Sequence, residues 1–337
     1  MTDTNQFRAP AAARSTSRRN LFAWGACLVT VAVSSLASAQ LEPQRMYYGI
    51  DRKVPMTVQI PAGAEGEAKI QLLQPVTASV NAEATVTAGG VDLAALFPQL
   101  WETQEPRLQY AQLVVGGEKV GPAVVLQPMV SPVYFYGGQG RPQGRRFGDT
   151  YSGVRAYIDM NVVMNTSMGE ITFRMRPDQA PNTVFNFLHL ADNGYYKDII
   201  FHRIIGERPG RPPFVVQGGD PTGTGTGGPG FFIDLEPSQL PHDFGVLSMA
   251  RSGEPNSNGS QIFICLSRAA TQGLDNSYTS FAQAISGAEV IKNLGSVETG
   301  EGDRPVDPPS ILTMKLVPAA PYGTGPDAVD APGTDGP

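Results

Sequence analysis

Short runs of apolar residues, many of them alternating with polar ones, mark the second half of the chain, and this pattern predicts β-strands. Alternate side chains of a strand face opposite sides, so each run presents one face to a core. The runs comprise residues 162–165, 171–175, 199–205, 214–217, 246–250, 261–266, 280–285 and 311–317.

Two segments between these runs show the spacing of helices instead. The first begins at Pro181, has apolar residues at i, i+3, i+4 and i+7 from Val184 onward, and ends at Gly194, where a left-handed residue is favoured. The second extends from Ala288 to Leu294. About eight strands with two helices predict a mainly β domain over residues 157–317, a closed eight-stranded antiparallel barrel whose ends the helices cap.

The first half of the chain has a different pattern. Residues 40–132 contain short valine-rich runs separated by turn residues such as Pro61 and Gly116-Gly117, which predicts a small β-rich accessory domain of unknown role. Residues 133–156 concentrate glycine, proline and arginine, as is typical of a linker. Residues 318–337 are mostly proline, glycine, alanine and aspartate, which predicts a disordered tail.

Residues 1–39 have the layout of a signal peptide. Arginines precede an apolar stretch from Leu21 to Val33, and Ala37-Ser38-Ala39 offers small residues for cleavage before Gln40. The stretch is shorter than the roughly 20 residues that a membrane span needs, so we expect no span after cleavage. The mature chain is therefore predicted to be exported, to the periplasm or outside the cell. Residues 17–22 resemble a twin-arginine signal with two apolar residues in reverse order, so the choice between this route and the Sec route stays open.

The charge balance and the few reactive residues narrow the chemistry. Acidic residues outnumber basic ones 31 to 25, which argues against nucleic acid as a partner. The chain has 3 histidines, and no cysteine joins them in a zinc motif, so we expect no metal and no cofactor. Residues 223–228 have the glycine spacing of a dinucleotide-binding loop, but Pro229-Gly230 follows where a helix would be needed. Cys27 lies in the predicted signal and Cys265 in an apolar run, so the mature chain has no pair for a disulfide.

Five short segments combine aromatic, amide and cationic residues in a way that a simple core does not require. They are Phe201-His202-Arg203, Phe214 to Asp220, Ser248 to Arg251, Asn258 to Ile264 and Leu274 to Phe281. Their order and spacing closely resemble those of cyclophilins, the cyclosporin-binding class of peptidyl-prolyl isomerases. The resemblance extends over residues 165–317.

The resemblance implies an enzyme that accelerates rotation about X-Pro bonds in exported, proline-containing client polypeptides and so assists protein folding. Judged from its strand alone, Arg203 fits a surface ion pair better; the resemblance assigns it the catalytic role. A fixed cation suits this reaction, because a hydrogen bond to the prolyl nitrogen weakens the conjugation that keeps the bond planar. The residues that the resemblance places at the substrate are Phe214, Val215, Gln217, Ala250, Arg251, Gln261, Phe263, Leu274 and Tyr278.

The chain departs from the usual cyclophilin pattern in several places. Val215 stands where a methionine is usual, Tyr278 replaces a frequent histidine, and Gly273 occupies the place of a tryptophan beside Leu274. The missing tryptophan argues against tight cyclosporin binding. Whether the chain binds cyclosporin at all stays open. Residues 206–213 are an insertion that borders the pocket. The alternative function is a peptide-binding scaffold or chaperone whose isomerase groove is weak or inactive.

Overall fold

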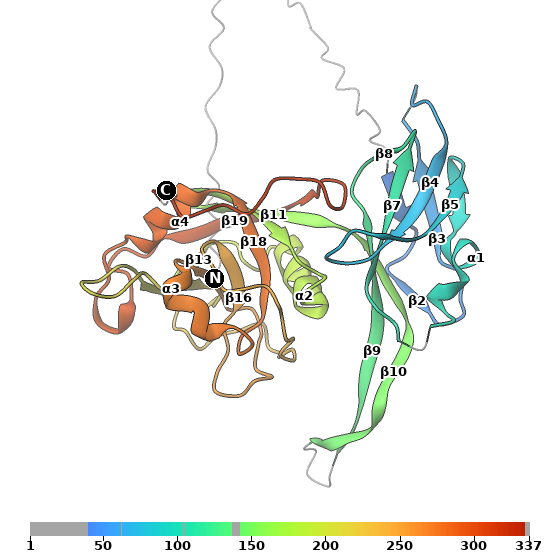
Figure 1. The fold of residues 1–337 in the computed structure, drawn as a ribbon. Coiled ribbons are helices and arrows are strands. Elements are labelled where there is room, and N and C mark those ends of the chain that lie inside the picture. Colours follow the sequence, from blue (N-terminus) through green and yellow to red (C-terminus); the bar gives the residue numbers. More distant parts are fainter. Residues whose placement is uncertain (1–39, 62, 104, 137–141, 334–337) are drawn as a thin grey trace, which may run out of the picture. The chain divides into compact units, whose positions relative to one another are not determined.

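The computed structural model describes residues 40–61, 63–103, 105–136 and 142–333 (Figure 1). The predicted signal peptide, residues 1–39, lies outside the described residues. So do residues 137–141 of the predicted linker and residues 334–337 of the predicted tail. All described residues belong to one compact unit.

Residues 40–158, here called the N-terminal β region, form two antiparallel sheets in the described part of the chain (Figure 1). The smaller sheet has the order β1-β3-β6, with β1 Gln40–Pro43, β3 Pro55–Gln59 and β6 Gly89–Asp92. The larger has the order β2-β10-β9-β7-β4-β5, and β8 also pairs with β7. Its strands are β2 Tyr47–Gly49, β4 Ala68–Leu73, β5 Val80–Val86, β7 Gln109–Val115, β8 Glu118–Lys119, β9 Val124–Tyr136 and β10 Pro142–Ile158. Two short helical turns, α1 Leu93–Leu96 and η1 Pro98–Leu100, follow β6.

The predicted linker is wrong in its described part, because residues 133–136 and 142–156 belong to the paired strands β9 and β10. The composition that indicated a loop is tolerated because the ladder between these strands is irregular, with several register shifts. Gly153 shows one reason for a glycine in this position. Its φ is +138°, and a Cβ there would overlap the carbonyl oxygen of Tyr48 on the neighbouring strand β2.

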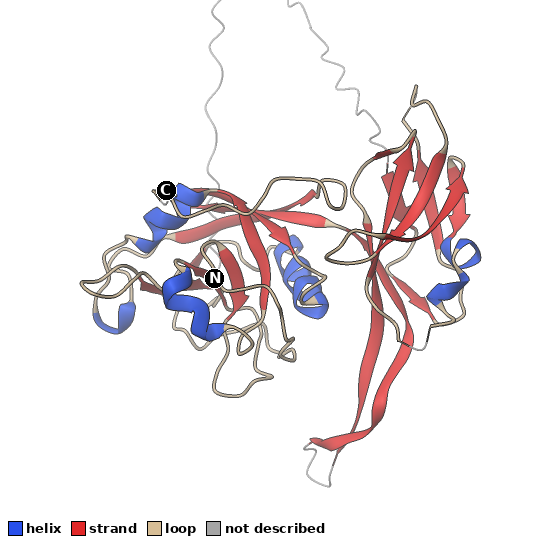
Figure 2. Cartoon of the chain, in the orientation of Figure 1, coloured by secondary structure: helices blue, strands red, loops and turns tan. Residues whose placement is uncertain are grey.

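The second half of the chain folds into a 9-stranded antiparallel sheet with the order β13-β19-β11-β12-β18-β16-β17-β15-β14. The strands are β11 Met160–Thr166, β12 Gly169–Met175, β13 Ile199–Ile200, β14 Arg203–Ile205, β15 Val215–Gly218, β16 Val246–Met249, β17 Ile262–Cys265, β18 Ser280–Ser286 and β19 Ser310–Pro318. Every run predicted as a strand in this half contributes to the sheet. Strands dominate the regular structure and helices are short and few (Figure 2), which confirms the mainly β class.

The prediction of a closed eight-stranded barrel is wrong. The run predicted as a single strand, residues 199–205, is two strands in the structure, because the ladder breaks at Phe201-His202. β13 pairs with β19, whereas β14 pairs with β15, so the run supplies both ends of the sheet and no ladder joins β13 to β14. Phe201 is fully buried at this break. The sheet is therefore an open, curved one, and the catalytic candidate Arg203 begins one of its end strands.

Two helices pack against this sheet, as predicted. α2, Pro181–Asp192, contacts β18 and β19, and α4, Ala288–Gly295, contacts β12, β14 and β15. Shorter turns are α3 Arg268–Thr271, η2 Gln272–Leu274 and η3 Glu301–Asp303. The apolar face of α2 buries Val184, Phe187 and Leu188 in the main hydrophobic core. Among the helices of the described residues, none has the length and apolarity needed to cross a bilayer.

The expected disorder of residues 318–337 does not hold for Tyr322, which is 8% exposed and belongs to the main hydrophobic core. Its ring stacks on Tyr110 with centroids 3.7 Å apart, and its backbone nitrogen donates to Gln112 Oε1 at 2.9 Å. Farther on, the backbone nitrogen of Val329 donates to the carbonyl oxygen of Ala284. The average polarity of the segment predicted disorder wrongly, because the buried ring of Tyr322 anchors the segment to the core.

Candidate active site

Three neighbouring strands bring the central residues of the site together. Arg203 on β14 is opposite Gln217 on β15, and Gln217 is in turn opposite Phe263 on β17. Because these residues are in register, their side chains lie on the same face of the sheet. The Arg203 side chain is 44% exposed, so its guanidinium is at the surface while the strand that carries it is anchored in the core.

A relay of amide side chains connects Arg203 to residues 223–228, here called the glycine-rich loop. Nη1 of Arg203 lies 3.5 Å from Oε1 of Gln217, whose Nε2 donates to Oε1 of Gln261 at 3.1 Å. Nε2 of Gln261 donates to the carbonyl oxygens of Gly225 and Gly227 at 3.0 and 2.9 Å. The acceptors and donors alternate along this relay, so both glutamines have a fixed amide orientation and Gln217 presents an oxygen to the arginine.

Asp220 holds the glycine-rich loop from inside. Its carboxylate accepts hydrogen bonds from the backbone nitrogens of Thr222, Gly225 and Gly227 at 2.7, 2.6 and 3.0 Å. Burial raises the pKa of Asp220, but the hydrogen bonds from the Thr222 hydroxyl and from these backbone groups outweigh burial and hold the pKa below its ordinary value. The loop that resembled a dinucleotide-binding motif is thus closed around its own carboxylate.

An apolar cluster lies on the strands next to the arginine. Its buried floor is Val215, Val246, Phe263 and Cys265, all at most 5% exposed. The partly buried residues packed against this floor are Phe214, Leu240, Ala250, Leu274 and Tyr278. The structure therefore assembles in one cluster all the apolar and aromatic residues that the sequence placed at the substrate. Leu240, Val246 and Cys265 complete the cluster and were not predicted.

The remaining predicted residue, Arg251, lies on the adjoining groove. A cavity of about 360 Å³ is lined by Gln217, Gln261, Ala250 and Arg251 together with the glycine-rich loop. Nε and Nη2 of Arg251 both donate to the carbonyl oxygen of Ser277, and its guanidinium lies 4.6 Å from the ring centre of Tyr278. Arg251 is thus tied to the pocket wall through Tyr278.

Beside the apolar cluster lies a polar network that the sequence analysis missed. The buried His242 ring lies 6.0 Å from the Phe263 ring, nearly parallel to it. Nδ1 of His242 is 3.0 Å from Asp275 Oδ1, and Nε2 is 2.9 Å from the Ser248 hydroxyl. Arg268 completes the network with two hydrogen bonds to the Asp275 carboxylate. Because Ser248 is opposite Phe263 in the sheet, its side chain lies on the same face, and the network supports Phe263 from the side.

A second carboxylate that the sequence analysis missed, Asp303, touches Arg203 itself. Its Oδ2 lies 3.5 Å from Nε of Arg203, and its Oδ1 lies 2.6 Å from Nη2 of Arg208. Both residues beside Arg203 are therefore acceptors, Gln217 on one edge of the guanidinium and Asp303 on another. In the described part of the chain no cluster of three histidine, cysteine or acidic residues is arranged to hold a metal.

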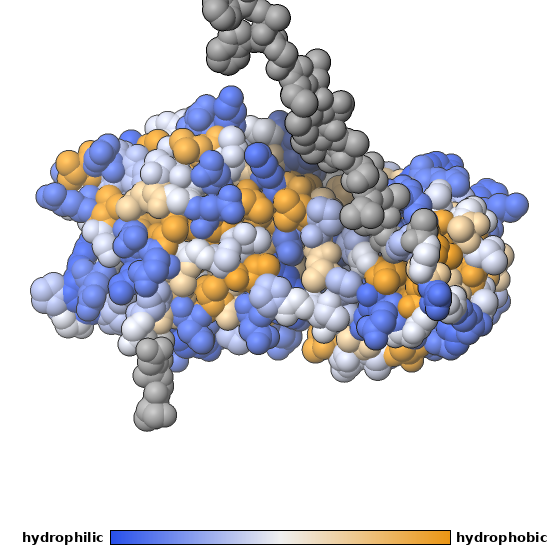
Figure 3. Space-filling view, turned by 90° about the horizontal axis from the view of Figure 1, so that it is seen from above, coloured by the Kyte–Doolittle hydropathy of each residue, from blue (hydrophilic) through white to orange (hydrophobic). Residues whose placement is uncertain are grey.

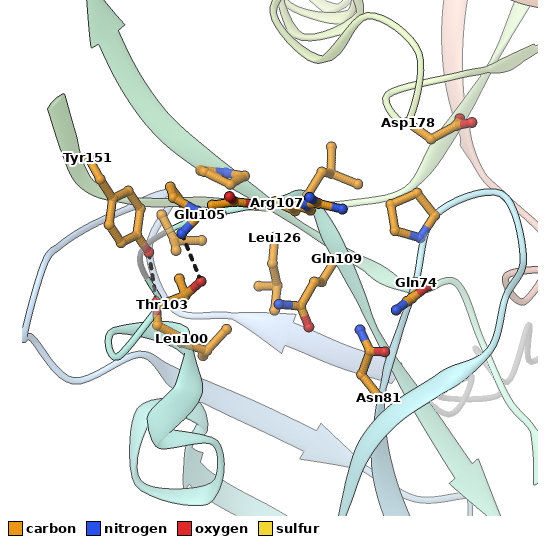
Figure 4. A pocket seen from close by; sticks show the side chains of 15 residues that line it. Gln74, Asn81, Leu100, Thr103, Glu105, Arg107, Gln109, Leu126, Tyr151 and Asp178 are labelled. Atoms are coloured by element: carbon orange, nitrogen blue, oxygen red, sulfur yellow. Dashed lines mark hydrogen bonds and ion pairs between the residues drawn. The ribbon is translucent and has the colours of Figure 1, made fainter. Parts of the chain in front are cut away.

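Another cavity lies elsewhere, in the N-terminal β region. It has a volume of about 510 Å³ and is lined by polar side chains such as Gln74, Asn81 and Arg107, with Asp178 at its edge (Figure 4). None of the predicted site residues lines it. On the face shown in Figure 3, hydrophobic residues are interspersed with hydrophilic ones. Among the described residues, the predicted site residues thus lie in the apolar cluster around Phe263 and in the adjoining cavity lined by Gln217 and Gln261.

Comparison with known proteins gives consistent matches to the second half of the chain. Residues 161–316 match the family described as "Cyclophilin type peptidyl-prolyl cis-trans isomerase/CLD". The chain is 46% identical over 162 residues to peptidyl-prolyl cis-trans isomerase-like 1 of Aspergillus fumigatus, which covers 47% of this chain and 95% of that protein. It is 43% identical over 157 residues to peptidyl-prolyl cis-trans isomerase ppi1 of Schizosaccharomyces pombe, covering 45% of this chain and 96% of the relative.

Among solved structures, a cyclophilin type peptidyl-prolyl cis-trans isomerase of Cryptosporidium parvum, crystallised in the presence of the dipeptide Ala-Pro, matches with 36% identity and a TM-score of 0.43. The match covers 47% of this chain and 99% of that one. A cyclophilin of Hirschia baltica matches with 24% identity and a TM-score of 0.40, over 47% of this chain and 74% of that one. The N-terminal β region lies outside the matched residues 161–316.

Proposed function

Since this chain belongs to the cyclophilin-type peptidyl-prolyl cis-trans isomerase family, we propose that it accelerates X-Pro rotation in exported client polypeptides with Arg203 as its catalytic residue. The family membership rests on relatives that the chain covers almost completely at more than 40% identity. The roles of individual residues are those that the resemblance to cyclophilins implies, and the geometry of the site supports them. The observation that carries them is a guanidinium held by Gln217 on the strand next to an apolar cluster around Phe263.

The chemistry of the reaction explains why this arrangement is effective. The planar X-Pro bond is stabilised by donation of the nitrogen lone pair into the carbonyl, and rotation removes that donation at a barrier of about 18–20 kcal/mol. As the bond twists, the nitrogen becomes pyramidal and basic. A guanidinium that donates to this nitrogen stabilises the twisted state more than either planar state, and only such a difference raises the rate.

The remaining residues hold the substrate while the bond rotates. The proline ring fits the apolar cluster around Phe263, where it is removed from water. Gln217 and Gln261 are fixed by their relay, so they orient Arg203 and offer polar contacts to the client backbone. Val215 is smaller than the usual methionine, so the pocket wall is less filled and the proline is held more loosely.

The test is an isomerisation assay on a short proline-containing peptide, followed by NMR exchange or by coupling to a protease that cleaves one isomer. We expect Arg203→Ala to lower kcat/KM by about 100-fold, the loss typical of removing one transition-state donor. Arg211→Ala, an exposed arginine on the nearby insertion, is the matched control. An Arg203→Ala variant as active as the wild type would exclude this mechanism, and an inactive wild type would favour the peptide-binding scaffold.

Export is the second part of the proposal, and residues 1–39 support it. We expect expression in a bacterial host to give a chain that begins at Gln40 in the periplasmic or extracellular fraction, as determined by N-terminal sequencing. Arg18→Lys together with Arg19→Lys distinguishes the two routes. Retention of the double variant in the cytoplasm indicates the twin-arginine route, whereas unchanged export indicates the Sec route.

A further inference from the structure

We propose that Arg208 and Asp303 form a bracket that positions the guanidinium of Arg203 for catalysis. Arg208 belongs to the insertion, residues 206–213, and Asp303 ends the turn η3. The inference rests on the proposed function, because it assigns positioning roles around the arginine that carries the isomerase chemistry. Neither residue touches the substrate in this proposal; both act through Arg203.

The carboxylate of Asp303 lies between two guanidinium groups. It faces Nε of Arg203 at 3.5 Å and Nη2 of Arg208 at 2.6 Å, and its side chain is 22% exposed. On the other side, Nη1 of Arg203 donates to Oε1 of Gln217. Within the described residues, Nη2 of Arg203 has neither a hydrogen bond nor an ion pair, so it is the group left to donate to a substrate.

The insertion has a defined structure that fixes Arg208. Residues 208–211 form a turn with Pro209 second and Gly210 third, and the φ of Gly210 is +74°, as a type II turn requires. Arg208 and Arg211 exchange two backbone hydrogen bonds, of 3.1 and 2.8 Å. The backbone nitrogen of Phe214 donates to the carbonyl oxygen of Ile205 at 2.8 Å and closes the base. The insertion is therefore a hairpin that continues β14 and β15, the strands that carry Arg203 and Gln217.

The loop that carries Asp303 is also held at both ends. The backbone nitrogen of Val306 donates to the carbonyl oxygen of Glu298 at 3.0 Å, and that of Gly300 donates to the carbonyl oxygen of Arg304 at 2.8 Å. The next residue, Arg304, donates from Nη1 to the carbonyl oxygen of Gly223 at 2.8 Å. One loop thus contacts the catalytic arginine through Asp303 and the glycine-rich loop through Arg304, which fixes the distance between two sides of the groove.

The charges explain why two arginines share one carboxylate. One negative and two positive groups leave the cluster positive, so Arg203 keeps its cationic character while its Nε edge is held. Without Arg208, Asp303 pairs with Arg203 alone and draws the guanidinium away from the substrate. Without Asp303, the Nε edge is unheld and the two like charges repel each other. Loss of either residue misplaces the guanidinium of Arg203. Loss of Arg208 has this effect only while Asp303 is present.

The experiment measures kcat and KM of the full chain on a proline-containing peptide. We expect Asp303→Asn to lower kcat about tenfold and to leave KM within about twofold, because a positioning residue acts on the transition state more than on binding. Arg208→Gln is expected to lower kcat about threefold in the wild-type background and to have no further effect in Asp303→Asn, as expected of coupled residues. Asp303→Glu should restore part of the rate.

The matched control is Arg211→Gln, which removes an exposed arginine from the same hairpin and should leave kcat unchanged. Wild-type kcat in Asp303→Asn, or effects of the two substitutions that simply multiply, would overturn the bracket. Should Asp303→Asn fail to fold, Arg208→Gln decides alone, since an unchanged kcat contradicts the proposal. Arg203→Ala in the same assay separates the two levels: if it is inactive while Asp303→Asn is normal, the bracket is wrong and the proposed function stands.

Discussion

Gly273 occupies the position where many cyclophilins have a tryptophan, and the space around its Cβ position is open. It lies in η2 beside Leu274, it is exposed, and a Cβ built on it meets no atom within 4 Å. We expect Gly273→Trp to fold normally and to increase cyclosporin affinity at least about tenfold, since an aromatic wall beside the pocket buries more ligand surface. Calorimetric titration of the wild type and the variant measures this. Equal affinities would show that the tryptophan position is not what limits cyclosporin binding here.

Two buried histidines make the stability of the fold depend on pH. Burial lowers the pKa of His242 below its ordinary value of 6.5, although the contact with Asp275 acts in the opposite direction. Burial also lowers the pKa of His202, with Asp220 opposing it. The unfolded chain then binds these protons at a higher pH than the folded chain, so stability is full above 6.5 and is lost as the pH falls below it.

We therefore expect the midpoint of thermal unfolding to fall between about pH 7 and about pH 5, with His242→Gln flattening the decline. Circular dichroism melts across this range measure it. His189→Gln, on the exposed side of α2, is the control and should leave the decline as it is. The low pKa of Asp220 adds a separate loss that begins only below its ordinary value of 3.8. A midpoint that stays constant from pH 7 to pH 5 would contradict the role of the histidines.

The residues of the apolar cluster were assigned to the substrate site by the resemblance to cyclophilins, because the short segments that carry them can be matched in order and spacing. Phe263, for example, lies in an apolar strand directly after an amide-rich turn. Asp303 could not be found in this way, because its carboxylate reaches Arg203 only when two distant loops fold against β14. His242 is similar, since its partners Ser248 and Asp275 lie on different elements. Polar groups that act across elements leave no periodic signal in the sequence.

At the scale of elements, α2 depends on a cap from a distant loop. Its N-cap residue, Ala180, offers no side-chain hydrogen bond. Instead the carboxylate of Glu236 accepts from the backbone nitrogens of Asn182 and Thr183 at 3.0 and 2.7 Å. We expect Glu236→Gln to lower the free energy of unfolding by about 1 kcal/mol, because a charged cap also favours the positive end of the helix dipole. Chemical denaturation measures the loss.

Asp234→Asn is the matched control for this cap. It removes one negative charge two residues away, on an exposed side chain. A general effect of net charge would change the stability of both variants equally, whereas a cap predicts a loss in Glu236→Gln alone. An equal change in the two variants would show that the hydrogen bonds to α2 contribute nothing.

The helices, whose apolar periodicity is strong, were predicted well. The strands whose bounds depend on the pairing partner were predicted poorly. The bounds of α2 and α4 agree with the sequence prediction to within two residues. The run 199–205 looks like one strand, but burial of Phe201 and the demands of two different partners divide it. Residues 133–156 were assigned to a linker by composition, although pairing between the consecutive strands β9 and β10 makes most of the described ones strands. Composition describes single residues, whereas a ladder depends on the strand that pairs with them.

At the scale of the whole molecule, the chain after β19 returns to the N-terminal β region. Tyr322 stacks on Tyr110 of β7, and its carbonyl oxygen accepts from Nζ of Lys119 at 2.8 Å. Its hydroxyl accepts from the backbone nitrogen of Val76 at 3.0 Å. The main hydrophobic core also includes Leu73, Tyr110 and Val125 of the N-terminal β region. The last part of the chain thus fastens the two halves through one aromatic residue.

We expect Tyr322→Ala to lower the free energy of unfolding by about 3 kcal/mol, since a buried aromatic ring and its stacking partner are lost. Tyr322→Phe keeps the ring and loses only the hydroxyl acceptor, so it should cost about 1 kcal/mol. Asp330→Asn, on an exposed side chain of the same segment, is the control. All three variants should keep the wild-type kcat/KM, because Tyr322 does not line the groove beside Arg203. If Tyr322→Ala were as stable as the wild type, the tail would not contribute to holding the halves together.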